Sequence, residues 1–182
     1  MTYANKKISY MASRSYDMVM RLNCRDVMDT PSVDKIDISI SDPSVALNKR
    51  NILPILVALE LITKQKPSII KSRGVLQQFN IRKGALIGGK ATIKGDSVIL
   101  FLENLIATVM PKVQNIQSFR KGNISKDGNL NLTFHDPLVF AELEQEFEKF
   151  SKVPDIKLSI NTTAKTKKEA LSLLSSMNIP FI

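Results

Sequence analysis

The stretch VDKIDISI (residues 33–40) alternates strictly between apolar and polar side chains. Three isoleucines fall on one side of an extended chain, and three polar residues fall on the other: Lys35, Asp37 and Ser39. A period of two is typical of a β-strand with one buried and one open face. The stretch therefore predicts a sheet that is covered on one side only.

The same alternation recurs further along the chain. Strands are predicted at Gly89–Gly95, Asn129–His135 and Asp155–Ala164, with a shorter candidate at Pro67–Ser72. The side chains predicted to face away from the core are mostly lysines, short hydroxyls and amides: Lys35, Ser39, Lys90, Thr92, Lys94, Asn131, Thr133, Lys157, Ser159 and Asn161. Asp37 is the only acid on this face. A face of lysines, hydroxyls and amides with so few acids fits contact with phosphates and ribose hydroxyls. An ordinary solvated sheet face is the alternative.

Helical patterns lie between these strands. Residues 4–22, Leu53–Lys64 and Asp96–Val113 predict helices, the last capped by Asp96 or Ser97 and ending near Pro111. A capping box of Thr166 and Glu169 opens a final helix, and Ser41–Asn51 is predicted to be a loop. This order predicts an α+β fold in one domain, residues 1–182: an antiparallel sheet with helices packed on one face and a long protruding loop.

The charge balance indicates the class of partner. The net charge is +9, which favours a polyanion: nucleic acid first, an anionic membrane surface second. No apolar run reaches eighteen residues, so no transmembrane helix is expected. Cys24 and His135 are the single cysteine and histidine, which leaves little for metal binding. No metal or cofactor is therefore predicted.

No catalytic arrangement emerges from the sequence. A histidine-dependent triad would need His135, which has no supporting motif around it. The stretch Gly84–Lys90 lacks the hydroxyl that should follow Lys90 in a phosphate-binding loop, and a strand follows where a helix is required. The acidic run Glu142, Glu144, Glu146 and Glu148 is interpreted as an unpaired, solvated surface or a contact to a basic protein. The prediction is a protein that is not an enzyme.

One long segment contains no acid at all. Lys64–Gly95 carries eight lysines and arginines and no Asp or Glu. Lysine and arginine neutralise phosphates, and nearby carboxylates would oppose that attraction. Within it, Gly74–Gly84 is too long for a tight hairpin turn. It has cations at its base and apolar and amide side chains between them: Arg73, Leu76, Gln77, Gln78, Phe79, Asn80, Arg82 and Lys83. The alternative is a flexible hairpin whose Phe79 folds back on the core.

Several blocks resemble the bacterial-type family of large-subunit ribosomal protein five. They are Gln65–Arg73 (QKPSIIKSR), Phe79–Gly95 (FNIRKGALIGGKATIKG), Asp155–Leu174 (DIKLSINTTAKTKKEALSLL), the terminal NIPF at Asn178–Phe181 and Val27–Ser39 (VMDTPSVDKIDIS). They occur in the family's order, and the resemblance spans roughly residues 5–181.

The resemblance implies a structural protein of the large ribosomal subunit that binds 5S rRNA and large-subunit rRNA in the central protuberance. By position, Gln65, Lys66, Lys90 and Thr92 match the family's RNA-binding face, and Arg73–Arg82 matches a loop that reaches the peptidyl-site tRNA. Neighbouring ribosomal proteins are implied partners, including small-subunit protein thirteen. The family usually has Asn where Ser39 stands. The uncharged Gln114–Ser118 replaces a charged turn near the small-subunit bridge, and the loop is less basic than in bacteria.

Two further matters stay open in the sequence. A free-standing regulatory RNA-binding protein is the alternative function, and a basic enzyme of nucleic-acid metabolism lacks the acid or metal groups it would need. The lysine-heavy, isoleucine-rich composition suggests an AT-rich genome, which predicts a mitochondrial member, with a plastid or bacterial one as the alternative. Residues 1–16 are basic and acid-free, as in a transit peptide or an ordinary first helix.

Overall fold

The structure, a computed structural model, describes residues 18–22, 29–75, 77–113 and 121–179. Its centre is a five-stranded sheet in the order β2-β3-β1-β5-β4, in which every neighbouring pair is antiparallel. The strands are β1 (Val33–Ser41), β2 (Ser68–Lys71), β3 (Leu86–Lys94), β4 (Leu130–Phe134) and β5 (Ile156–Thr162). The strand of residues 33–40 is therefore the central one, and the α+β prediction is confirmed.

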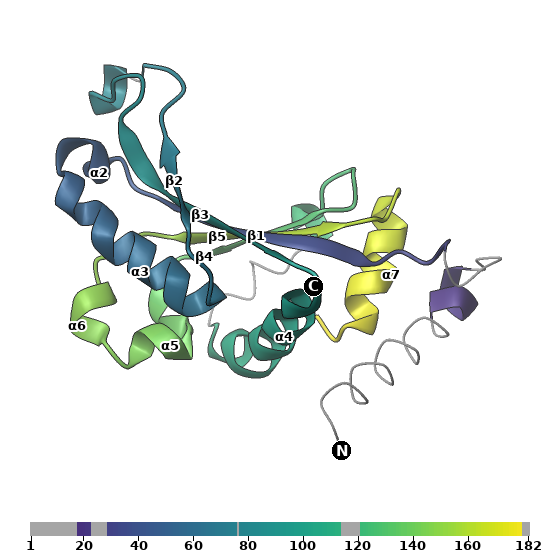
Figure 1. Cartoon of the computed structure of the whole chain (residues 1–182). Coiled ribbons are helices and arrows are strands. Elements are labelled where there is room, and N and C mark those ends of the chain that lie inside the picture. Colours follow the sequence, from purple (N-terminus) through teal and green to yellow (C-terminus); the bar gives the residue numbers. More distant parts are fainter. Residues whose placement is uncertain (1–17, 23–28, 76, 114–120, 180–182) are drawn as a thin grey trace.

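Helices cover one side of the sheet (Figure 1). They are α3 (Ile52–Thr63), α4 (Asp96–Asn104), α5 (Ala141–Glu144), α6 (Phe147–Phe150) and α7 (Lys167–Ser176). A π-helical turn (Leu105–Val109) and a 3-10 turn (Met110–Lys112) extend α4, so the predicted long helix exists but changes its winding from Leu105 onward. Residues 18–22 are also helical; the rest of the predicted helix 4–22 lies outside the described residues.

The core lies between the sheet and these helices. Ile36, Ile38 and Ile40 of β1 are fully buried there, as the alternation predicts. Phe134 of β4 meets Phe140 edge to face, with ring centroids 5.6 Å apart. Burying one such large apolar side chain stabilises the fold by about 1.5–3 kcal/mol. The apolar positions of the sheet thus hold the helices on one side and leave the other side to polar residues.

Two glycines let β3 pack closely against its neighbours. A Cβ on Gly88 would stand 2.1 Å from the carbonyl oxygen of Ile40 on β1. A Cβ on Gly89 would stand 2.8 Å from a methyl carbon of Leu59 on α3. Since β3 starts at Leu86, three residues before the predicted start, both glycines lie inside the strand, where they allow close contact with β1 and α3.

Two local predictions are wrong. Ser41–Asn51 is not a loop throughout: it forms α2 (Ser44–Leu47) and a 3-10 turn (Lys49–Asn51). Asp42 organises this turn by accepting a hydrogen bond from the Ser44 amide at 2.8 Å, and one helical turn is too short to show a period. The N-cap of α4 is Gly95, at a φ of 66°, rather than Asp96 or Ser97. Short 3-10 turns also occur at Gln77–Phe79, Lys121–Asn123 and Pro137–Val139.

Candidate nucleic-acid interface

The polar residues of the strands gather in rows across the side of the sheet away from the helices. One row joins Lys94, Lys35 and Asn161; the next joins Thr92, Asp37, Ser159 and Asn131; the third joins Lys90, Ser39, Lys157 and Thr133. Residues directly opposite each other in an antiparallel pair point to the same side. We call these eleven residues the polar face. The structure thus brings together every outward-facing strand residue predicted from the sequence.

Asp37 is the hub of the polar face. Its Oδ1 accepts a hydrogen bond from Thr92 Oγ1 at 2.5 Å and lies 3.1 Å from Lys90 Nζ. Its Oδ2 accepts a hydrogen bond from Asn161 Nδ2 at 3.0 Å. Burial raises the pKa of Asp37, but the hydrogen bonds from Thr92, Lys90 and Asn161 and the charge of Lys90 outweigh burial and lower its pKa. The carboxylate is therefore ionised at neutral pH and already has partners.

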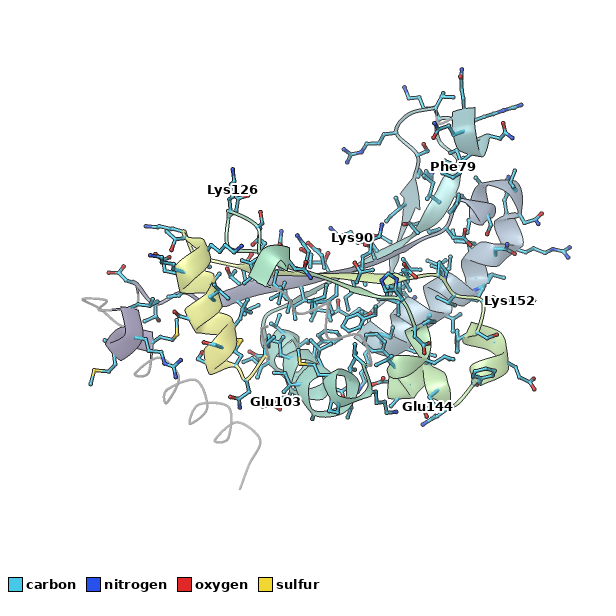
Figure 2. All side chains as sticks on the ribbon, turned by 180° about the vertical axis from the view of Figure 1, so that it is seen from behind. Phe79, Lys90, Glu103, Lys126, Glu144 and Lys152 are labelled. Atoms are coloured by element: carbon cyan, nitrogen blue, oxygen red, sulfur yellow. The ribbon has the colours of Figure 1, made fainter. Side chains whose placement is uncertain are left out.

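Lysines stand out on the open side of the sheet. Figure 2 shows Lys90 and Lys126 on the open side of the sheet, and Glu103 and Glu144 on the helix side. On the polar face Lys94 and Lys157 are exposed, and Lys35 and Lys90 are half-buried. Because Asp37 has only 17% of its side chain exposed, the lysines dominate what a ligand meets. A phosphate chain approaching this side meets cations first.

Gln65 and Lys66, which were placed by resemblance, lie just before β2. Ser68 at the start of β2 is opposite Lys90, and its hydroxyl donates to the Lys90 carbonyl oxygen at 2.9 Å. Both predicted residues therefore lie at the edge of the sheet beside β3, with Lys66 exposed and Gln65 half-buried. Ser68 belongs to the same surface. Sequence reasoning missed it because a strand of four residues barely shows alternation.

The segment between β2 and β3 projects from the sheet as a long loop (Figure 1). Ser72 closes its base: its amide donates to the Ala85 carbonyl at 2.8 Å, and the Gly84 amide donates to the Ser72 carbonyl at 2.9 Å. The polar and aromatic loop residues predicted to face a partner are exposed, together with Gly74: Arg73, Gly74, Gln77, Gln78, Phe79, Asn80, Arg82 and Lys83. Leu76 lies outside the described residues.

The position of Phe79 decides between the two interpretations of this loop. Its side chain is 52% exposed, and Figure 2 shows it out on the projecting loop. The alternative in which Phe79 folds back on the core is therefore wrong. Ile81, two residues later, is buried instead, at 3% exposure. An apolar ring on an exposed loop between Arg73 and Arg82 is available to a partner.

The sequence suggested that the acidic run is unpaired, but in the structure most of it, on the helix side, has partners. Glu142 accepts from Asn104 Nδ2 at 3.0 Å, Glu144 pairs with Lys112, and Glu146 pairs with Lys149 at 2.9 Å. Two of these partners lie more than thirty residues away in sequence, so a local pattern could not reveal them. Glu142 and Glu144 therefore tie α5 to Asn104 and Lys112 of the α4 segment, and Glu146 pairs within the first turn of α6.

Among the residues that the structure describes, the remaining titratable side chains show no second site. His135 Nδ1 lies 2.9 Å from Asp155 Oδ2 at the ends of β4 and β5, where both side chains are well exposed. Within the described ranges, no three His, Cys, Asp or Glu side chains are placed to hold a metal ion. None of the helices described there is long and apolar enough to cross a bilayer.

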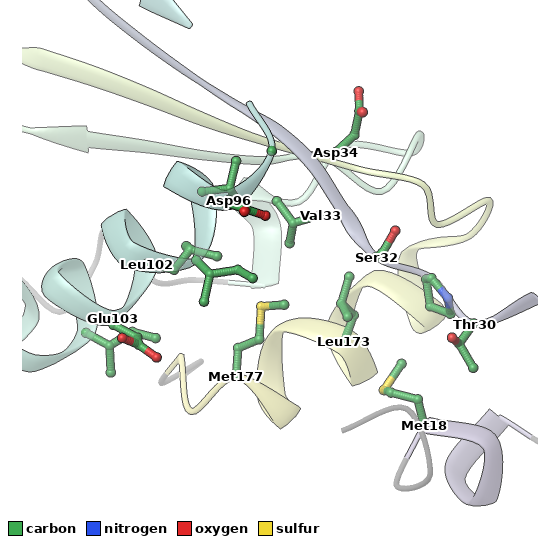
Figure 3. Close-up of a pocket in the computed structure, with 15 residues that line it drawn as sticks. Met18, Thr30, Ser32, Val33, Asp34, Asp96, Leu102, Glu103, Leu173 and Met177 are labelled. Atoms are coloured by element: carbon green, nitrogen blue, oxygen red, sulfur yellow. The ribbon is translucent and has the colours of Figure 1, made fainter. Parts of the chain in front are cut away.

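A cavity of about 410 Å³ opens between the start of β1, α4 and α7 (Figure 3). Its walls are mainly apolar, with Met18, Val33 and Leu102 among them, and Leu173 and Met177 contributed by α7. Asp34, Asp96 and Glu103 give its rim an acidic character. A polyanion would be repelled from such a rim, so the cavity lies apart from the polar face in both position and charge.

The comparisons with known proteins identify the family. The fold and the polar face define a basic α+β protein with its helices on one side of the sheet. Residues 86–181 match the model for the C-terminus of the ribosomal L5 family. The chain is 40% identical over 164 residues to the large ribosomal subunit protein uL5m of Reclinomonas americana, covering 90% of each chain. It is 33% identical over 172 residues to uL5 of Buchnera aphidicola subsp. Baizongia pistaciae, covering 94% of this chain and 95% of the relative.

The chain belongs to the uL5 family of ribosomal proteins. Members of this family are structural components of the ribosome and not enzymes, so the predicted family and the predicted lack of enzymatic activity are both confirmed. The predicted site residues are brought together on one surface and one loop, and their contacts with RNA remain predictions.

Proposed function

We propose that the chain is a structural constituent of the large ribosomal subunit, and that its polar face binds 5S rRNA and adjoining large-subunit rRNA in the central protuberance. The polar face carries the proposal, because it presents four lysines whose one neighbouring carboxylate is already paired. Lys35, Ser39, Lys90, Thr92 and Lys94 act at its centre, and Gln65 and Lys66 act at its edge. Lysines neutralise phosphates and release counterions, which is the main source of affinity for a nucleic acid.

The projecting loop has a separate role in this proposal. Arg73, Arg82 and Lys83 supply cations at its base, and Phe79 supplies an apolar surface near its tip. We assign this loop to the peptidyl-site tRNA, following the family resemblance. Its length supports that assignment, because long loops in compact proteins are commonly functional.

Two finer assignments follow from the family resemblance. The bridge to small-subunit protein thirteen is placed near Gln114–Ser118, which lie outside the described residues, so it rests on sequence alone. The mitochondrial matrix is the proposed location, supported by the likeness to the Reclinomonas protein, with a plastid or a bacterial cytoplasm as the alternative. One domain is proposed for the whole chain, because β1 and β2 precede the family match yet pair with strands inside it.

Sedimentation of the tagged protein through a sucrose gradient tests the proposal. We expect it to migrate with large subunits, and we expect sequencing of the RNA that co-purifies with it to return 5S rRNA. A pool that remains entirely free of subunits would support the alternative, a free-standing regulatory RNA-binding protein. That alternative in its single-strand form would need stacking aromatics on the sheet. The polar face has none.

A further inference from the structure

The single acid on the polar face holds its neighbours in a fixed orientation. The carboxylate of Asp37 is surrounded by hydrogen-bond donors from two neighbouring strands: Thr92 and Lys90 of β3, and Asn161 of β5. An ionised carboxylate can only accept hydrogen bonds. Each neighbour must therefore point a donor toward Asp37, and it can present to a ligand only the donors and acceptors that this hydrogen bond does not use.

Thr92 and Ser159, on either side of Asp37 in the central row, are left as acceptors. Thr92 has one hydroxyl proton, and because that proton goes to Asp37, the oxygen offers only lone pairs outward. Asn161, in the row of Lys35 and Lys94, gives one amide N–H to Asp37, and its carbonyl oxygen keeps its capacity to accept beside the second N–H. Ser159, beside Asp37 in the same row, likewise donates its proton, to Asn131 Oδ1 at 2.7 Å. Phosphate oxygens are acceptors too, so the hydroxyl oxygens of Thr92 and Ser159 offer them no hydrogen bond, whereas Asn131 at the end of the row keeps its amide N–H donors.

Cations lie on both sides of this central row. Lys94 and Lys35 belong to the row on one side, with Asn161, and Lys90 and Lys157 belong to the row on the other. These rows are four residues apart along each strand, or roughly 13 Å at the usual rise of a strand. Phosphates thus suit the lysines of the two flanking rows, while hydrogen-bond donors suit Thr92 and Ser159 between them.

We propose that Asp37 is a positioning residue that makes the centre of the polar face a set of acceptors for donor groups of the RNA, foremost the ribose 2′-hydroxyls. This inference rests on the proposed function of the face. An A-form helix displays its 2′-hydroxyls along a wide, shallow minor groove bounded by phosphates, which matches the acceptors of Thr92 and Ser159 between rows that contain lysines. The 2′-hydroxyl also distinguishes RNA from DNA, so Asp37 gives the face that selectivity without touching the RNA.

The charge of Asp37 and its positioning role predict opposite results for Asp37→Asn. By charge alone, removing an acid strengthens binding to RNA, and Asp34→Asn on the same strand is the matched control, because Asp34 is exposed and lies off the polar face. By positioning, an amide at position 37 must point its NH₂ group at Thr92 or Asn161, and that partner then turns its acceptor inward. We expect Asp37→Asn to bind a 5S rRNA transcript about three- to tenfold more weakly. Asp34→Asn should bind it equally or more tightly.

Analogue interference identifies the donors. One pool of transcripts carries sparse 2′-deoxynucleotides, and a second carries inosine in place of guanosine, which lacks the base amino group. For the wild-type protein we expect a small set of 2′-deoxy positions to be depleted from the bound fraction, and for Asp37→Asn we expect part of that set to return. Inosine interference that Asp37→Asn relieves would support the same acceptors with base amino groups as the donors.

Thr92→Val is the second variant, because it removes one outward acceptor and leaves Asp37 paired with Lys90. It should relieve the same positions even if Asp37→Asn proves unstable. Identical affinity and interference in the wild type, Asp37→Asn and Thr92→Val would overturn the positioning role while leaving RNA binding in place. A wild-type protein that fails to bind the transcript would overturn the proposed function, and this inference with it.

Discussion

Replacing Lys90 and Lys94 together by alanine tests whether the polar face binds RNA. Lys94 is exposed, and 43% of the Lys90 side chain is exposed, so neither replacement opens a cavity in the core. Lys90 also lies 3.1 Å from Asp37. Removing Lys90 therefore both deletes a cation and exposes the carboxylate of Asp37, and the polar face becomes less positive by the charge of two lysines.

The size of the effect follows from counterion release. Each phosphate that a lysine neutralises in a duplex contributes about −0.9 to the slope of log K against log salt concentration. Two lysines make that slope shallower by about 1.8. Over a fourfold rise in salt, from about 50 to 200 mM, the affinity gap between wild type and variant should narrow by roughly twelvefold. Lys94→Ala alone should give about half of the change in slope.

Fluorescence anisotropy of a labelled 5S rRNA transcript across a salt series measures the slope. The control is Lys112→Ala with Lys149→Ala, which removes the same charge from the helix side, where both lysines pair with glutamates. The control should keep the wild-type slope. If the Lys90 and Lys94 variant stays folded by thermal unfolding and its affinity and slope do not change, the polar face is not the RNA surface.

Three further outcomes are expected. Deleting Val75–Asn80 and closing the gap with one glycine should leave 5S rRNA binding intact, because the described side chains that it removes are exposed. The occupancy of assembled ribosomes by tRNA should fall. Loss of rRNA binding would instead make the loop part of the rRNA-binding surface. Gly88→Ala should destabilise the protein by more than the roughly 1–3 kcal/mol of ordinary overpacking, because its Cβ would meet backbone atoms. Gly89→Ala should destabilise it less, because its Cβ would meet leucine methyl groups that can move. Equal urea midpoints for the two variants would refute this reasoning. The pKa of Asp37 is lower in the folded protein than its ordinary value of 3.8, so on acidification the unfolded chain takes up the proton first. The contribution of Asp37 to stability is therefore complete above pH 3.8 and is lost as the pH falls through the pKa of the folded state. On acidification, the urea midpoint of Asp37→Asn should fall less than that of the wild type.

Local periodicity predicted most of the elements. β1, β4 and β5 lie within a residue or two of their predicted bounds, because each has a buried and an open face and so alternates visibly. Thr166 and Glu169 form the predicted cap of α7: the Thr166 hydroxyl accepts from the Glu169 amide at 3.3 Å, and Glu169 Oε2 accepts from the Lys165 amide at 2.9 Å. These hydrogen bonds span three or four residues, so a short sequence window contains both partners.

Contacts between distant segments could not be predicted from the sequence. Asp37 is bonded to Thr92, 55 residues away, and to Asn161, 124 residues away, through the order and register of three strands. No window around residue 37 shows that register. The side of the loop to which Phe79 turns was equally undetermined, because an apolar ring in a loop suits both the core and a partner.

The hub at Asp37 also changes what the scarcity of acids on this surface means. Counting charges treats Asp37 as a defect in a basic surface, to be outweighed by the lysines around it. In the structure its charge is paired with Lys90, and its oxygens accept hydrogen bonds from Thr92 and Asn161. The lysines of one face repel one another without a ligand, and a carboxylate between their two rows relieves part of that repulsion in the free protein. An acid placed here therefore costs the surface little attraction for phosphate, whereas an exposed and unpaired acid would oppose phosphate directly. The pairing of an acid, more than its presence, decides whether it belongs on a surface of this kind.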